Sequence, residues 1–204
     1  MDLRMENLTA FVLAGGKSTR MGADKAFLEL AGRPLIAHAV ALAAAVVPQV
    51  RIVGGPEKFA AWGEVVPDVF ADRGPLGGIH AGLQASQTDC NLILGVDLPF
   101  VETRLLEFLI EQANACDAMV TVPFAAGHFQ TLCAVYRKTF LPVGERALFE
   151  GRNRVDALFS KVETHVIGEQ ELAGEGFQPS MFRNLNTQED WQAARREFEP
   201  HQRL

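Results

Sequence analysis

The segment of residues 13–25 gathers residue types that bind phosphate. It reads Leu-Ala-Gly-Gly-Lys-Ser-Thr-Arg-Met-Gly-Ala-Asp-Lys and follows a short apolar run. Glycines let backbone N–H groups approach a ligand closely, and Lys17, Arg20 and Lys25 could neutralise its charge. The combination indicates a polyphosphate and therefore a nucleotide, although one or two of the cations could instead form only a solvated loop surface.

Three better-known glycine motifs do not fit this segment. A P-loop needs a glycine five residues before its Gly-Lys-Ser/Thr end, and Phe11 stands at that position. The dinucleotide fingerprint G-x-G-x-x-G would need glycines in place of Lys17 and Arg20. The serine-hydrolase elbow G-x-S-x-G would also need a glycine in place of Arg20. The loop therefore belongs to another class of phosphate site.

Asp97 is a candidate metal ligand. It ends the apolar run of residues 92–96 and is followed by Leu98-Pro99, so its carboxylate is held at the tip of a strand. A single carboxylate there suits Mg²⁺, which takes one or two protein oxygens beside water and substrate phosphates. A helix-capping or turn aspartate would fit the same place. Asp68 and Asp72 could likewise contact a ribose or a metal, or could be turn residues.

Glycines and asparagines form two further groups. Gly77 and Gly78 open a helical pattern, where they fit close approach of a base or ribose as well as tight packing on a sheet. For Gly82, inside the same helix, packing is favoured. Asn184 and Asn186 alternate across an extended segment just before a helix, so both side chains face one side, although such residues often only cap or turn.

Short apolar runs alternate with helical patterns around these residues. The expected strands are residues 10–13, 50–53, 65–66, 91–96, 118–122 and 132–136. The expected helices are residues 35–47, 57–62, 76–87, 104–115 and 187–198, the last behind a capping-box pattern. This order predicts an α/β fold whose mostly parallel sheet has helices on both faces and binds ligands at its carboxyl edge. Residues 168–179 are expected to form a mobile loop.

Composition narrows the class of protein. The 204 residues, 48% of them hydrophobic, suffice for one well-packed domain. A formal net charge of −6 argues against broad binding to nucleic acid or anionic membranes. Cys90, Cys116 and Cys133 lack the paired spacing of a zinc site, so we expect buried apolar cysteines in a reducing compartment. No signal peptide or membrane-spanning run is visible, and a cytoplasmic location is expected.

The segment 13–25 resembles the L-A-G-G-x-S-x-R-M-G-x-D-K signature of the MobA-type nucleotidyltransferases, the molybdenum cofactor guanylyltransferases. The resemblance continues in order through residues 28–34, 74–78, 97–101 and 184–187, and so spans nearly the whole chain. One matching segment would be weak, but several in the same order are specific. The implied fold is a Rossmann-like nucleotidyltransferase.

The resemblance also implies how the chain is divided and which residues act. It implies a single domain of residues 1–204, with a GTP-binding half at about 9–100 and an acceptor-binding half at about 101–198. Implied catalytic residues are Lys25, Arg20 and Asp97, with Mg²⁺ bound by Asp97, and Asn184 and Asn186 are implied near the acceptor. The implied nucleotide-binding residues are Leu13, Ala14, Gly15, Gly16, Lys25, Gly54, Asp68, Gly77, Gly78 and Asp97.

The activity that the resemblance implies is transfer of GMP from GTP to the terminal phosphate of molybdenum-molybdopterin, with release of pyrophosphate. Molybdenum-insertion proteins and molybdoenzyme chaperones are implied as partners. Leu-Ala-Gly-Gly at residues 13–16 favours GTP over CTP, since related cytidylyltransferases tend to read Leu-Ala-Ala-Gly. Thr131 replaces a proline usual in the family. Alternatives are a nucleotidyltransferase using CTP or another phosphorylated acceptor, or a non-catalytic GTP- or cofactor-binding protein.

Overall fold

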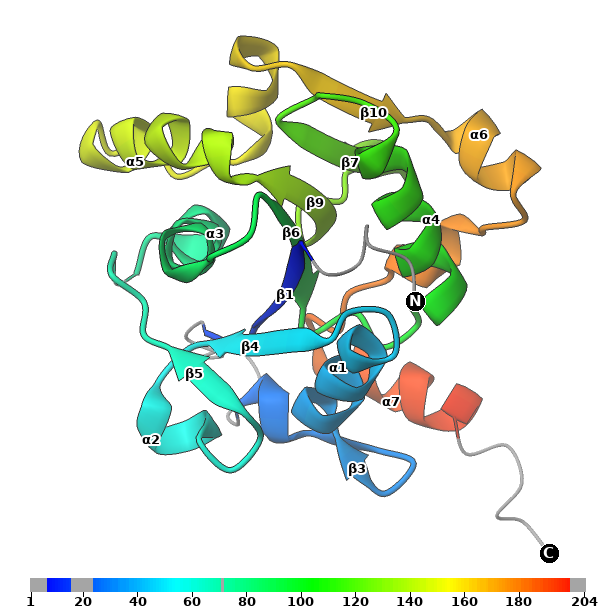
Figure 1. Ribbon diagram of the computed structural model, residues 1–204. Coiled ribbons are helices and arrows are strands. Elements are labelled where there is room, and N and C mark those ends of the chain that lie inside the picture. Colours follow the sequence, from blue (N-terminus) through cyan, green and yellow to red (C-terminus); the bar gives the residue numbers. More distant parts are fainter. Residues whose placement is uncertain (1–6, 16–23, 71, 199–204) are drawn as a thin grey trace, which may run out of the picture.

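A mixed sheet forms the centre of the protein. The computed structural model describes residues 7–15, 24–70 and 72–198, and the sheet order is β10-β7-β9-β6-β1-β4-β5 (Figure 1). Its strands are β1 (Leu8–Leu13), β4 (Gln49–Val53), β5 (Glu64–Val66), β6 (Cys90–Gly95), β7 (Val120–Ala125), β9 (Cys133–Arg137) and β10 (Thr164–Ile167), with β8 (His128–Phe129) paired to β7. A separate hairpin consists of β2 (Glu29–Leu30) and β3 (Arg33–Pro34).

Helices cover both faces of this sheet. They are α1 (Leu35–Ala44), α2 (Pro56–Phe59), α3 (Gly74–Ala85), α4 (Thr103–Asn114), α5 (Leu141–Phe149), α6 (Glu169–Gly174) and α7 (Gln188–Phe198). Short 3₁₀ turns are η1 (Lys25–Phe27), η2 (Lys138–Phe140), η3 (Asp156–Lys161) and η4 (Pro179–Phe182). The strands and helices expected from the sequence are present with ends shifted by a few residues. The predicted α/β fold, a mostly parallel sheet between helices, is confirmed.

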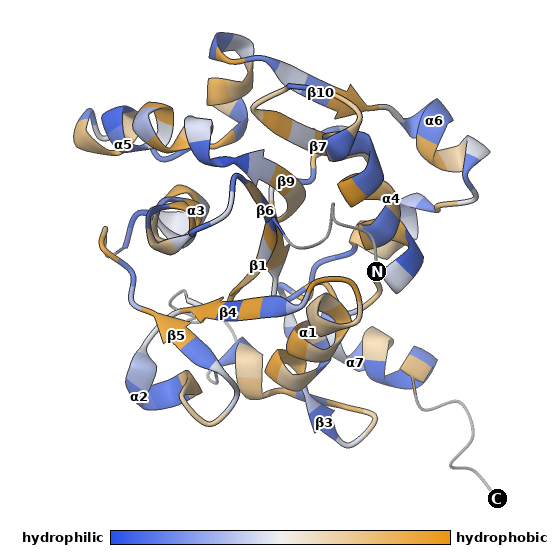
Figure 2. Ribbon diagram, in the orientation of Figure 1, coloured by the Kyte–Doolittle hydropathy of each residue, from blue (hydrophilic) through white to orange (hydrophobic). Residues whose placement is uncertain are grey.

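Strand β1 contributes side chains to the hydrophobic cores on both faces of the sheet. It is buried along its whole length and apolar for most of it (Figure 2). Successive side chains of a strand point to opposite faces. Leu8, Ala10 and Val12 accordingly join the core under α1 and α4, whereas Phe11 and Leu13 join the core under α3 and α5. A strand buried on both faces reads as a continuous apolar run.

Along the path β10-β7-β9-β6-β1-β4-β5 of the described sheet, β9 runs opposite to the other strands, and the short β8 beside β7 is antiparallel as well. Strand β9 pairs antiparallel with β6 and with β7, while β10, β7, β6, β1, β4 and β5 run the same way. The chain passes from β7 to β9 through a short return that includes β8. A parallel connection would need a crossover of a dozen residues or more. The shortness of the return therefore makes β9 antiparallel.

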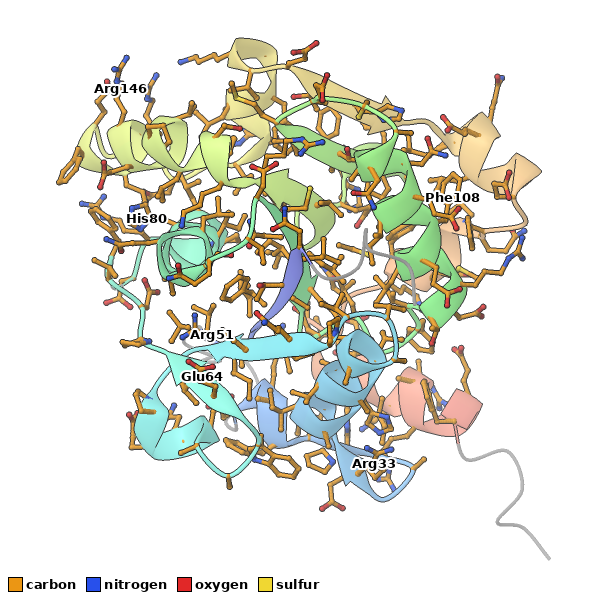
Figure 3. All side chains as sticks on the ribbon, viewed as in Figure 1. Arg33, Arg51, Glu64, His80, Phe108 and Arg146 are labelled. Carbon is orange, nitrogen blue, oxygen red and sulfur yellow. The ribbon has the colours of Figure 1, made fainter. Side chains whose placement is uncertain are left out.

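Arg51 ties one flank of the sheet together. From β4 its guanidinium pairs with Glu64 on β5, which lies opposite it in register, and donates to the Ala85 carbonyl at the end of α3 at 2.8 Å (Figure 3). The carbonyls of a helix's last turn have no partner within the helix. Arg51 satisfies one of them and fixes the end of α3 against the sheet.

The prediction of a mobile loop at residues 168–179 is wrong. The segment contains α6, and both Leu172 and Phe177 are buried. The ring of Phe177 lies 5.4 Å from that of Phe108 on α4. A helix of six residues with a single buried position is too short to show helical periodicity, which explains the error.

One smaller prediction concerns the start of α7. The capping box before α7 is confirmed, because Thr187 Oγ1 accepts from the Asp190 amide at 3.1 Å and Asp190 Oδ2 accepts from the Thr187 amide at 2.8 Å.

Cys90 and Cys133 are buried as expected, and burial raises the pKa of Cys133 to about 12. Cys116 is only partly buried, since it lies in the turn after α4, so the expectation of burial is wrong for it.

Within the described ranges, no helix has the length and apolar character needed to cross a bilayer.

Candidate functional site

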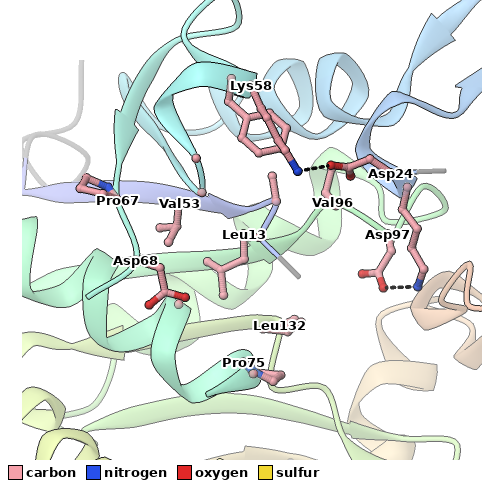
Figure 4. Close-up of a pocket in the computed structure, with 18 of the residues that line it drawn as sticks. Leu13, Asp24, Val53, Lys58, Pro67, Asp68, Pro75, Val96, Asp97 and Leu132 are labelled. Atoms are coloured by element: carbon pink, nitrogen blue, oxygen red, sulfur yellow. Dashed lines mark hydrogen bonds and ion pairs between the residues drawn. The ribbon is translucent and has the colours of Figure 1, made fainter. Parts of the chain in front are cut away.

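A cleft of about 850 Å³ opens at the carboxyl ends of β1, β4, β5 and β6 (Figure 4). Ligands of open α/β sheets bind at this edge. Most of the residues singled out in the sequence, although distant along the chain, line this one cleft. Those lining it are Leu13, Ala14, Gly15, Lys25, Gly54, Asp68, Asp72, Gly78, Asp97 and Asn186.

Backbone hydrogen bonds continue past the strands and hold the floor of the cleft. The amides of Ala14 and Gly15 both donate to the Val53 carbonyl, at 3.0 and 3.2 Å. The Gly54 amide donates to the Val66 carbonyl at 3.0 Å. Strand β4 thus holds the start of the loop after β1, and β5 holds the start of the loop after β4. Gly15 and Gly54, which follow β1 and β4, lie against each other.

Gly54 has no room for a side chain. A Cβ there would lie 2.8 Å from the ring of Phe59, the buried last residue of α2. Gly15 differs, since a Cβ there would meet its nearest neighbours at 3.8 Å or more. Gly54 therefore keeps the cleft floor flat by packing against Phe59, whereas Gly15 is open to a ligand.

Lys25 lies in the part of the cleft wall that also carries Asp97 and Asn186. Its Nζ is 3.5 Å from Asp97 Oδ2 and donates to Asn186 Oδ1 at 2.8 Å. Asp24 caps η1 by accepting from the Ala26 amide at 3.2 Å, which fixes the backbone of Lys25 at the start of that turn. The side chains of Lys25 and Asp97 remain 18% and 20% exposed, so a ligand in the cleft can reach both.

Gly95 and Leu185 position Asp97, and the sequence analysis missed both. A Cβ on Gly95 would lie only 2.9 Å from Asp97 Oδ1, so the carboxylate occupies space that any other residue would fill. The Leu185 amide donates to the Asp97 carbonyl at 3.1 Å and fixes its backbone. A glycine inside a buried strand was the available signal, because such a glycine often marks a close approach.

The site fits a Mg²⁺ ion held mainly by a nucleotide. Among the described residues, no cluster of three or more His, Cys, Asp or Glu could enclose a metal by itself. Mg²⁺ uses one or two carboxylates and completes its shell with water and substrate phosphates. Asp97, a single reachable carboxylate beside Lys25, has the donor chemistry for that role.

Asp68 forms a tight turn at the far wall. Its Oδ1 accepts from the Phe70 amide at 3.1 Å. Desolvation of the carboxylate raises the pKa of Asp68 despite that hydrogen bond and the nearby His80. Asp72 also lines the cleft and has a positive φ of 61°. Both aspartates remain candidates to contact a nucleotide.

The glycines of α3 serve packing in different degrees. A Cβ on Gly77 would lie 2.9 Å from the Phe70 carbonyl oxygen, and Gly77 is not among the described residues of the cleft wall. Gly78 lines the cleft, and a Cβ on it would lie 2.9 Å from the side chain of Leu13. A Cβ on Gly82 would lie 3.0 Å from the Phe11 ring, which agrees with the packing interpretation. Only Gly78 combines packing with access to a ligand.

Lys58 is a cleft residue that the sequence analysis missed. It lies on α2 and its Nζ is 3.1 Å from Asp24 Oδ2 (Figure 4). The residue falls in a short helix without any phosphate motif, so no local signal could have identified it. Its ion pair joins α2 to the turn that carries Lys25.

Not every sequence candidate can be assigned to the cleft. Gly16, Lys17 and Arg20 lie outside the described residues. Asn184 is exposed and is not among the described residues lining the cleft. The Thr131 carbonyl accepts from the Tyr136 hydroxyl at 2.9 Å, so residue 131 serves the turn into β9.

Comparison with known proteins gives consistent matches. The sequence profile of the MobA-like NTP transferase domain matches residues 10–165. A probable molybdenum cofactor guanylyltransferase of Pelotomaculum thermopropionicum is 34% identical, covering 94% of this chain and 93% of its own. The molybdenum cofactor guanylyltransferase of Desulfosudis oleivorans is 33% identical, with coverages of 93% and 95%. These matches run nearly end to end in both chains.

A solved structure shows the same fold. Molybdopterin-guanine dinucleotide biosynthesis protein A of Archaeoglobus fulgidus superposes with a TM-score of 0.81 at 24% identity, covering 93% of this chain and 97% of its own. The fold of the sheet and its helices has therefore already been seen in a crystal structure.

Proposed function

Since the chain belongs to the MobA-like NTP transferase family and is thus a nucleotidyltransferase, we propose that it transfers GMP from GTP to the terminal phosphate of molybdenum-bound molybdopterin. The observation that carries this proposal is the Lys25–Asp97 pair, which lies in the same cleft as the glycine turn after β1. A cation, a carboxylate with the donor chemistry for Mg²⁺ and a glycine backbone that a ligand can approach closely are what a nucleoside triphosphate needs. Relatives named for this activity support the choice of substrates.

The proposed chemistry is a substitution at the α-phosphorus. An oxygen of the acceptor's terminal phosphate forms a bond to the α-phosphorus of GTP. The bond from that phosphorus to the α–β bridging oxygen breaks, and pyrophosphate leaves with the electron pair. A phosphate monoester is largely dianionic near neutral pH, because its second pKa is about 6. The nucleophile needs no general base.

The residues of the chain would then act by positioning and charge. Lys25, together with Arg20, would stabilise charge developing on the α-phosphate and on the departing pyrophosphate. Backbone groups of residues 13–16 and Gly54 would seat the nucleotide, and Asp68 would contact its ribose. Asp97 would hold Mg²⁺. When bound there, the ion neutralises phosphate charge and orients the phosphate oxygens.

The remaining parts of the proposal concern the acceptor and the setting. Residues 9–100 would form the nucleotide half and residues 101–198 the acceptor half, with Asn184 and Asn186 near the pterin. Guanine selection rests on the Leu-Ala-Gly-Gly turn. Delivery by molybdenum-insertion proteins, transfer to molybdoenzyme chaperones and a cytoplasmic location stay predictions from the sequence and its relatives.

The test is release of pyrophosphate in the presence of Mg²⁺, measured with GTP, CTP or ATP and with molybdenum-loaded molybdopterin as the acceptor. We expect release with GTP alone, dependent on acceptor and lost in Asp97→Ala. Release with CTP instead would keep the mechanism and change the base. Activity retained in full by Asp97→Ala would contradict the assigned metal ligand.

A further inference from the structure

Asn186 makes a close contact with Lys25 in the cleft. The Lys25 ammonium donates to the Asn186 side-chain oxygen at 2.8 Å, whereas its distance to Asp97 is 3.5 Å. The two residues are 161 positions apart in the sequence. The resemblance of the sequence to its family associates Asn186 with the acceptor, yet its amide contacts the lysine expected to bind the nucleotide's phosphates.

The backbone around Asn186 is held in place on both sides. Asp190 Oδ2 accepts from the amides of Asn186 and Thr187 at 3.0 and 2.8 Å. Although desolvation acts the other way, the hydrogen bonds from Thr187 and Asn186 and the charge of Lys25 lower the pKa of Asp190. On the other side, Leu185 is buried and donates to the Asp97 carbonyl. The Asn186 oxygen is therefore presented to Lys25 by a fixed backbone.

The amide and the carboxylate that contact Lys25 differ in what they do to its charge. Asp97 is an anion, so it competes with a phosphate for the Lys25 ammonium, and a metal would compete with Lys25 for the carboxylate. Asn186 is neutral, so it orients the ammonium without cancelling the charge that a phosphate needs. A lysine side chain loses more rotamer freedom than most when it is ordered. A contact that orders it before the ligand arrives lowers the cost of binding.

We propose that Asn186 is a positioning residue for Lys25, and that it therefore acts on the nucleotide as well as on the side of the acceptor. The inference rests on the proposed function of the cleft. It predicts that removing the Asn186 amide weakens binding of the nucleotide when no acceptor is present, which a residue that contacts only the acceptor would not do.

Asn184 provides a matched control. It lies two residues earlier on the same extended segment, is of the same type and is exposed like Asn186, but it is not among the described residues that line the cleft. Both asparagines belong to the candidate acceptor segment. Only Asn186 is hydrogen-bonded to Lys25 among these two described side chains. Comparing Asn186→Ala with Asn184→Ala therefore separates the two roles.

The experiment is calorimetric titration of the full-length protein with nucleoside triphosphate and Mg²⁺, without acceptor. GTP, CTP, ATP and UTP are each tested on the unmodified protein, and the tightest is used for the variants. Asn186→Ala should raise the dissociation constant by about 3- to 15-fold, the range for one lost hydrogen bond to a charged group that is partly solvated. Asn184→Ala should leave it within about twofold, and thermal unfolding should be the same for both.

A double-mutant cycle shows whether Asn186 acts through Lys25. In the Lys25→Ala background, Asn186→Ala should cause no further loss of affinity, since the group it positions is gone. Equal affinities of Asn186→Ala and the unmodified protein would overturn the inference, and so would losses that simply add. Tightest binding of CTP would overturn guanine selection but leave the test of Asn186 intact. Binding of none of the four nucleotides would overturn both proposals.

Discussion

At the scale of single residues, the charges that line the cleft do not by themselves favour a triphosphate. The described wall carries Asp24, Glu57, Asp68, Asp72 and Asp97 against the cations Lys25 and Lys58. Both lysines are paired with a carboxylate, Lys25 with Asp97 and Lys58 with Asp24. A polyanion binds in such surroundings when a divalent metal and the lysines offset the acidic groups. This balance of charges supports the proposal that Mg²⁺ and Lys25 act together on the triphosphate.

Lys25→Ala tests the cation at this site. We expect kcat to fall by about 10²- to 10³-fold, because one positioned donor to the developing charge is lost. The fold should survive, since the side chain lies at the cleft surface. Steady-state release of pyrophosphate gives kcat, and circular dichroism with thermal unfolding reports the fold. Full activity in a folded Lys25→Ala protein would rule out the assigned role.

Asp68→Asn tests the carboxylate on the far wall. The pKa of Asp68 is raised by desolvation, so the folded state holds its proton more tightly than the unfolded state does. The aspartate therefore loses stability as pH rises from its unfolded pKa through its raised folded pKa, and that cost persists at neutral pH. Asparagine carries no charge and can still accept from the Phe70 amide.

We therefore expect Asp68→Asn to be at least as stable as the unmodified protein at pH 7 and to show no advantage below pH 3, while nucleotide affinity falls. Urea unfolding at the two pH values measures the difference. A clear loss of stability at pH 7 would mean that the charge of Asp68 stabilises the fold, contrary to the direction of its pKa.

At the scale of elements, the features predicted correctly from the sequence are those that a short stretch of neighbouring residues determines. The strands β1 and β6 are continuous apolar runs, and the cap of α7 is a short motif, so both could be read from neighbouring residues. The direction of β9 depends on how closely the chain returns after β7. The helix α6 packs on β7, and Phe177 just after the helix packs on Phe108 of α4. Such contacts are not encoded in a short window of sequence.

Gly95→Ala tests how β6 presents Asp97. A new Cβ would lie 2.9 Å from Asp97 Oδ1 and 3.2 Å from Leu132 Cβ, so the carboxylate must move. We expect a loss of about 1–3 kcal/mol in unfolding free energy from overpacking, and a higher Mg²⁺ concentration for half-maximal activity. Chemical unfolding and a Mg²⁺ titration of activity provide the two readouts.

Gly168→Ala is the control for Gly95→Ala, because a Cβ at Gly168 meets nothing within 4 Å. It should leave the Mg²⁺ dependence unchanged, and because Gly168 is the N-cap of α6 it should cost at most about 1 kcal/mol of unfolding free energy. An unaltered Mg²⁺ dependence in Gly95→Ala would show that Asp97 does not need the space beside Gly95.

Leu172→Ala tests whether α6 is a packed element. Leu172 is buried on this short helix, and truncating a buried leucine costs about 2–5 kcal/mol. We expect a loss in that range in urea unfolding, with kcat per folded molecule unchanged because α6 lies on β7, away from the cleft. A mobile loop would instead tolerate the change, and a stability loss near zero would restore that view.

At the scale of the whole molecule, the cleft depends on both halves of the chain. The first half supplies Lys25 and Asp97, and the segment before α7 returns to place Asn186 beside them. The sequence could nominate these residues one by one, through the glycine and cation turn, the strand-end aspartate and the paired asparagines. It could not show that Asn186 and Lys25 touch, nor that Lys58 joins the wall, because only the folded sheet brings those segments together.

The most direct test of the proposed reaction follows the α-phosphate itself. The unmodified protein is incubated with Mg²⁺, molybdenum-loaded molybdopterin and GTP labelled with ³²P at the α-position, and the products are separated. We expect the label to appear in the pterin dinucleotide in proportion to the pyrophosphate released. Label that stays in free guanine nucleotide while the acceptor is unchanged or gains the γ-phosphate would contradict attack at the α-phosphorus and, with it, the function proposed for the cleft.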